Sequence, residues 1–125
     1  MATHDIERER WGAFFDEFSR RRQGMLVTIE AVAPESGPQV ETRGLPFVGI
    51  TLDRKGSGGD TIEILTGTER DDHLSHTIPA PTRVYHKTGA GVMSDEVNPD
   101  EILEITSSGD PPITYLRFQR PPDAQ

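Results

Sequence analysis

The sequence predicts an α+β protein in which one N-terminal amphipathic helix packs on a twisted, mostly antiparallel sheet of six or seven strands. Two observations lead to this fold class. Aromatic side chains recur at the i, i+3, i+4, i+7 spacing of one helix stripe, at Trp11, Phe14, Phe15 and Phe18. After Gly24, nearly every apolar run alternates with polar residues, as half-buried strands do. We expect the sheet either to stay open or to curl into a half-barrel.

The helix is expected to begin after Thr3 or Asp5, since each has the short polar side chain typical of an N-cap. It runs to the Arg20–Arg22 triplet, whose positive charge suits the C-terminal end of a helix dipole, and Gly24 is placed to end it. An alternative interpretation is that the triplet binds a phosphate or carboxylate group.

Seven segments after the helix have the two-residue periodicity of strands. They cover residues 25–32, 40–43, 48–52, 61–66, 82–87, 101–107 and 113–118. Turn-forming Pro, Gly and Asp residues join the first to the second, the third to the fourth and the sixth to the seventh, so these pairs are expected to be antiparallel neighbours. The fifth segment has no assigned neighbour, and residues 67–81 are expected to be the least regular part of the chain.

Between the second and third segments, Gly44-Leu45-Pro46 interrupts the alternation. Because Pro cannot donate a hydrogen bond to a strand ladder, we expect a bulge or an edge there. The apolar residues expected to face the helix are Val27, Ile29, Val48, Ile50, Ile62, Ile64, Leu103, Ile105, Leu116 and Phe118.

Length and composition limit the classes of protein to which this chain can belong. With 125 residues, the chain is expected to form a single globular domain over residues 1–118, followed by a Pro-rich tail at 119–125 that frays. There is no Cys, which excludes disulfides and thiolate chemistry, and no cofactor is expected. A net charge of −8 disfavours nucleic acid and anionic membranes. No membrane span or signal peptide is recognisable, so a cytoplasmic location is expected.

Metal chemistry has one candidate segment, around Asp72, His73 and His76. In a helical turn the two histidines would lie on one face and share a metal with the carboxylate, and His86 would be a third nitrogen ligand. In an extended segment they would point to opposite faces. The acidic run at residues 94–101 lacks the calcium-loop pattern and is expected to be a solvated turn.

Three stretches of the sequence are distinctive together: the N-terminal Trp/Phe helix, His76-x-Ile78-x-x-Pro81-x-x-Val84 and the closing Leu103-Glu104-Ile105…Gly109…Thr114-Tyr115-Leu116-Arg117-Phe118. In these stretches the chain resembles a family of small bacterial proteins known only as a domain of unknown function. The resemblance implies no activity, ligand or catalytic residue. Within it, His76 is expected to bond the main chain and fix a strand crossing. The alternative is that His76 lines a pocket between that crossing and the helix.

The sequence therefore favours a non-catalytic binding or interaction module, with a protein or small molecule of unknown identity as its partner. A homodimer through an exposed sheet face or edge is also expected. The alternative is a metal-dependent or acid–base enzyme that uses Asp72, His73 and His76.

Overall fold

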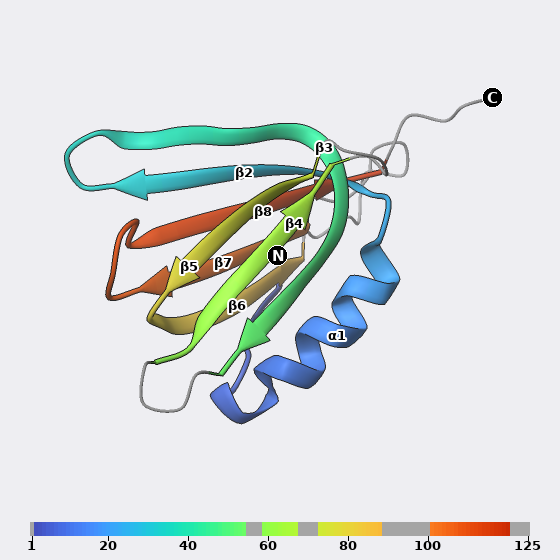
Figure 1. Ribbon diagram of the computed structural model, residues 1–125, viewed down its shortest axis with the longest axis horizontal. Coiled ribbons are helices and arrows are strands. Elements are labelled where there is room, and N and C mark those ends of the chain that lie inside the picture. Colours follow the sequence, from blue (N-terminus) through green and yellow to red (C-terminus); the bar gives the residue numbers. More distant parts are fainter. Residues whose placement is uncertain (1, 55–58, 68–72, 89–100, 121–125) are drawn as a thin grey trace.

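A helix and a large antiparallel sheet make up the described chain. The computed structural model describes residues 2–54, 59–67, 73–88 and 101–120 (Figure 1). The helices are η1 (a 3-10 turn, Arg8–Arg10) and α1 (Trp11–Arg22). The strands are β1 (Ala2–Asp5), β2 (Leu26–Ala33), β3 (Gly37–Asp53), β4 (Thr61–Thr66), β5 (Leu74–Pro79), β6 (Pro81–Thr88), β7 (Glu101–Ser107) and β8 (Ile113–Gln119). The α+β class is as predicted, with eight described strands instead of six or seven.

The sheet order is β1-β6-β7-β8-β2-β3-β4-β5, and every neighbouring pair is antiparallel. The three expected neighbour pairs are confirmed as β2–β3, β3–β4 and β7–β8. The predicted fifth segment corresponds to β6, which lies between β1 and β7. The sheet remains open, with β1 and β5 at its two edges.

The expected start of the helix is wrong. Thr3 and Asp5 lie in β1, opposite Lys87 and Tyr85 of β6, so neither caps a helix. The N-cap position of α1 is instead occupied by Arg10, which makes no side-chain capping hydrogen bond. Short polar residues favour caps only where no partner strand is near, and here the exposed edge of β6 pairs with them. The other end agrees with the prediction, since α1 ends at Arg22 and the chain reverses through Gly24 at a φ of +89°.

Strand β3 merges two segments that the sequence separates. Its first part pairs with β2 and its second part with β4, and the ladder with β2 shifts register on both sides of Ile29. The bulge expected near Gly44 is confirmed, and Gly44 has a φ of +62°. The strand curves through this region (Figure 1), because bulges bend and twist the strand that carries them. The curve brings β5 across from β2 and β8.

Two further local predictions are wrong. Residues 67–81 were expected to be irregular, but Leu74–Pro79 forms a regular strand that pairs with β4 along its whole length. Val48 was expected to face inward, but it is only half-buried, because a register shift between Phe47 and Gly49 turns Phe47 into the core instead. The expected fraying of 119–125 concerns residues mostly outside the described chain, although Gln119 is the last residue of β8.

The hydrophobic core lies between α1 and the sheet. From α1, Trp11, Phe15 and Phe18 are buried, while Phe14 is half-buried at the border of the core. The ring of Phe18 meets that of Phe118 edge to face, with centroids 5.1 Å apart. Fully burying each such ring contributes about 1.5–3 kcal/mol, so the helix stripe stabilises the sheet as the sequence predicts. No helix in the described part of the chain is long and apolar enough to cross a membrane.

Candidate functional site

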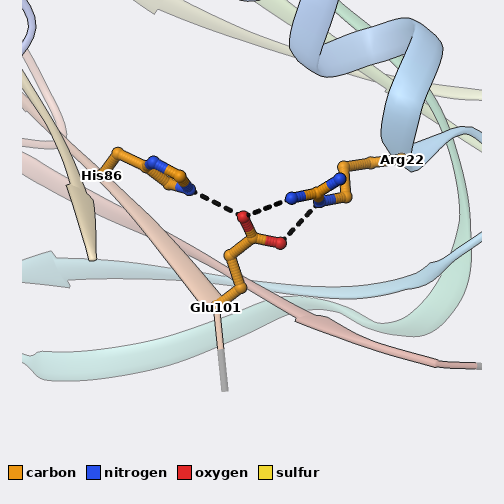
Figure 2. A network of polar contacts seen from close by, with 3 residues as sticks. All are labelled: Arg22, His86 and Glu101. Atoms are coloured by element: carbon orange, nitrogen blue, oxygen red, sulfur yellow. Dashed lines mark hydrogen bonds and ion pairs between the residues drawn. The ribbon is translucent and has the colours of Figure 1, made fainter. Parts of the chain in front are cut away.

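A charged cluster joins the C-terminal end of α1 to β6 and β7. The carboxylate of Glu101, the first residue of β7, lies between the guanidinium of Arg22 and the imidazole of His86 (Figure 2). Arg22 Nε donates to Oε1 at 2.6 Å, and a second guanidinium nitrogen donates to Oε2 at 2.8 Å. His86 Nε2 donates to Oε2 at 2.6 Å. We call these three residues the Glu101 clamp.

The clamp keeps Glu101 ionised although the residue is only 8% exposed. Burial raises the pKa of the carboxyl, but the hydrogen bonds from His86 and Arg22 and their charge outweigh burial and hold that pKa at about 2. A carboxylate accepts protons and cannot donate them, so the Nε2 atom of His86 carries the proton of the shared bond. Because three N–H donors from two residues already occupy its oxygens, Glu101 has little basicity left for acid–base catalysis. The clamp is therefore a structural tie between helix and sheet.

The Glu101 clamp corrects one sequence prediction and shows what one residue of the Arg triplet contacts. Glu101 was assigned to a solvated acidic turn but is buried, whereas residues 94–100 of that run lie outside the described residues. Within the Arg20–Arg22 triplet, Arg22 binds a carboxylate, but this carboxylate is Glu101 of its own chain. Arg21 instead pairs with Glu17 on the helix surface at 3.4 Å. The alternative that the triplet binds a phosphate or carboxylate of a ligand stays a prediction.

The residues predicted to bind metal are placed as follows. Asp72 lies outside the described residues, His73 is exposed just before β5, and His76 lies within β5, half-buried. His86 belongs to the Glu101 clamp. Across residues 2–54, 59–67, 73–88 and 101–120, no group of three or more His, Asp or Glu side chains is arranged to hold a metal ion.

His76 joins two strands that are not neighbours in the sheet. Its Nε2 atom is 2.8 Å from Oγ1 of Thr42, a buried residue in the first part of β3. His76 therefore bonds a side chain, not the main chain as the sequence suggested. It also lines a cavity, but that cavity lies between β5 and residues of β2, β3 and β8 and not beside the helix.

Two adjoining cavities of about 260 Å³ each form a groove along this part of the molecule. The first is lined by Ile29, Ala31, Glu41, Ser75, His76, Thr77, Ile78, Pro111 and Thr114, and the second by Ala31, Ala33, Ser36, Gly37, Gln39, Glu41, Asp110 and Pro111. They share Ala31, Glu41 and Pro111, and we call them together the β5 groove. Four consecutive residues of β5 line it, so the groove follows the edge of that strand rather than one face of it.

One hydrogen bond shows which main-chain groups of β5 face the groove. Ala80 N–H donates to the carbonyl of Asp60 at 3.2 Å, continuing the β4–β5 ladder. Hydrogen-bonded and non-hydrogen-bonded residue pairs alternate along an antiparallel ladder. Every second residue, counted back from Ala80 along β5, therefore directs its N–H and C=O groups toward β4. The N–H and C=O groups of Ser75 and Thr77 face the other way, toward the free edge. Within the described residues, no hydrogen bond reaches these four groups.

Pro79 is the next residue whose main chain should face the free edge, and its contact agrees with this alternation. The carbonyl of Pro79 accepts a hydrogen bond from Ser107 Oγ, which lies on the side away from β4. That contact covers the C-terminal end of the β5 edge. Among the residues that the structure describes, the part of the β5 edge without a hydrogen-bond partner is therefore limited to Ser75 and Thr77, where the groove lies.

The comparisons with known proteins agree with the resemblance seen in the sequence. The model of the family described as "Family of unknown function (DUF5335)" matches residues 2–124. An uncharacterised protein of the bacterium Aquifex aeolicus (strain VF5) is 34% identical over 85 residues, which cover 68% of this chain and 70% of that protein. No solved structure matches. The chain therefore belongs to the DUF5335 family of proteins of unknown function.

Proposed function

We propose that this protein is a non-catalytic binding module that takes up an extended polypeptide segment in the β5 groove. The observation that carries the proposal is the pair of edge residues Ser75 and Thr77. Their N–H and C=O groups, which have no hydrogen-bond partner among the described residues, face a cavity on the open edge of the sheet. An extended segment that pairs with such an edge adds one strand to the sheet, a common mode of peptide recognition.

The energetics fit a weak and reversible interaction. Four main-chain hydrogen bonds would contribute about 0.5–1.5 kcal/mol each. The inward side chains of the segment would contact Ala31 and Thr114 on the opposite wall of the groove. Ordering the segment opposes these gains, so affinities in the micromolar to millimolar range are expected.

The groove also suits a peptide better than a small molecule. Its two adjoining cavities of about 260 Å³ each follow the edge of β5, which fits the elongated shape of an extended segment. A larger cavity of about 430 Å³, between α1 and the β3–β4 hairpin, is the main rival site. There the main-chain groups of Ile50 are already paired, since Ser19 Oγ both donates to the carbonyl and accepts from the N–H of Ile50.

The test uses three fluorescein-labelled octapeptides of alternating Val and a polar residue, which is Lys, Gln or Glu. Fluorescence anisotropy is measured with the wild-type protein, Thr77→Pro and Thr77→Val. Pro at an outward-facing edge position removes the N–H and is tolerated by sheets, whereas Val keeps both the N–H and the branched side chain. We expect at least one peptide to bind wild type and Thr77→Val and to bind Thr77→Pro at least about tenfold more weakly.

The proposal is overturned if no peptide binds at millimolar concentration, or if binding is the same in all three proteins. Circular dichroism shows whether each variant is folded. If Thr77→Pro does not fold, a peptide N-methylated at alternate residues replaces it as the probe, because methylation removes the peptide N–H groups that would donate to the carbonyls of Ser75 and Thr77. Undiminished binding of that peptide would equally contradict the proposal.

A further inference from the structure

The geometry points to a basic segment as the occupant of the β5 groove, with a Lys or Arg side chain contacting Glu41 and Asp110. This inference rests on the function proposed above and names the chemistry of the partner. It is carried by the placement of two exposed carboxylates along the groove and by the absence of Lys and Arg from the described residues that line it.

Glu41 reaches the groove because of a bulge in β3. The register passes from Ile29 opposite Thr42 to Glu30 opposite Val40, so Glu41 is the extra residue of that strand. A bulge redirects the side chain that it adds. Glu41 accordingly lines both cavities, beside the inward-facing Ala31. Without the bulge, strict alternation would place Glu41 on the face opposite to Thr42, away from the groove.

Asp110 supplies the second carboxylate. It lies in the turn between β7 and β8, exposed, and lines the second cavity together with Glu41. Glu41 and Asp110 come from distant parts of the chain, and both line one cavity of about 260 Å³. A cationic side chain lying there would contact both, whereas an acidic segment would be repelled by both.

The inward side chains of the segment should follow an alternating pattern. Side chains two residues apart in a strand lie on one face, about 6.6–6.8 Å from each other. One inward side chain would lie on the apolar wall of Ile29, Ala31 and Thr114, and the next would reach Glu41. The expected partner motif is therefore an apolar residue and a Lys or Arg two positions away.

Charge also argues against a second copy of this chain as the occupant. The chain carries a net charge of −8, and pairing two β5 edges would bring the Glu41 and Asp110 carboxylates of both copies into one region. Like charges so arranged oppose association.

The experiment compares the Lys, Gln and Glu octapeptides on wild-type protein, Glu41→Gln, Asp110→Asn and, as a control, Glu17→Gln. Glu17 is an exposed acid on α1, with a side chain 57% accessible, so its replacement changes the net charge equally. We expect the Lys peptide to bind wild type most tightly. Glu41→Gln and Asp110→Asn should each weaken its binding by about two- to fivefold, and Glu17→Gln should not. Raising the salt concentration to 0.5 M should reduce the preference for Lys.

The outcomes separate this inference from the function on which it rests. Equal binding of the Lys and Gln peptides to wild type, with sensitivity to Thr77→Pro retained, overturns the basic partner and leaves the binding module standing. Failure of all peptides overturns the module itself. A dimer seen by light scattering that is lost in Thr77→Pro would identify a second copy as the occupant and contradict the inference.

Discussion

Replacing Glu101 by Gln should destabilise the protein by about 3 kcal/mol at neutral pH. The folded state holds the pKa of this carboxyl at about 2, compared with its ordinary value of 4.5, and a difference of that size corresponds to about 3 kcal/mol. The buried position supports the magnitude, because removing one partner of a buried ion pair leaves Arg22 without its counter-charge.

The same reasoning fixes the direction of the pH dependence. Because the pKa of Glu101 is lowered on folding, its contribution to stability is fully present above about pH 4.5 and is lost as the pH falls toward about 2. The difference in unfolding free energy between wild type and Glu101→Gln should therefore shrink from about 3 kcal/mol at pH 7 to less than about 1 kcal/mol near pH 2.

Urea unfolding followed by the fluorescence of Trp11 measures this difference at several pH values. Trp11 is the only Trp in the chain and is buried, so its emission reports on the core. Glu17→Gln is the matched control, since its partner Arg21 is exposed and the pair is worth less than about 1 kcal/mol. A Glu101→Gln variant as stable as the control, with an unchanged pH slope, would refute the role of the Glu101 clamp.

Three further substitutions test the packing of the fold. Trp11→Ala should cost about 3–5 kcal/mol because it empties a buried site under α1; a thermal melt by circular dichroism that shifts only slightly would contradict the role of the helix. Ser19→Ala removes both hydrogen bonds to Ile50 and should cost about 1–3 kcal/mol in urea unfolding, and an unaffected midpoint would show that the helix is not tied there. Thr42→Val removes the partner of His76 and should cost about 1–2 kcal/mol, with Thr42→Ser as the conservative variant that restores most of it; equal loss in both would argue against the hydrogen bond.

The elements that could be predicted are those in which apolar residues recur with the period of a helix or a strand. The helix stripe at Trp11, Phe15 and Phe18 and the alternation of residues 61–66 or 113–118 identify their elements because each buries one regular face. The neighbouring pairs follow, since short turns connect antiparallel strands.

The edge strands could not be predicted in the same way. β1 and β5 pair on one side only and carry few buried side chains, Ile78 being the single core residue of β5. Their formation depends on partner strands far along the chain, and no local pattern records that dependence. For the same reason the capping residues predicted at Thr3 and Asp5 proved to be strand residues.

The residues of the candidate site could not be predicted from local patterns for a related reason. Arg22 and Glu101 are 79 residues apart, and no spacing rule connects them. The direction of Glu41 depends on a bulge whose register only the β2–β3 ladder defines. The one usable signal was His76, which the resemblance to the family singled out and which lines the β5 groove.

The measurement that bears most directly on the proposed function is an NMR titration of ¹⁵N-labelled protein with the Lys octapeptide, followed residue by residue. If the segment adds to the edge of the sheet, the amide signals of Ser75 and Thr77 should move downfield, and their hydrogen exchange should slow as new bonds form. The signal of Ala31 should shift with them, since it lies on the opposite wall. Shifts confined to the cavity around Ser19 and Leu65, with Ser75 and Thr77 unchanged, would contradict the β5 groove as the binding site.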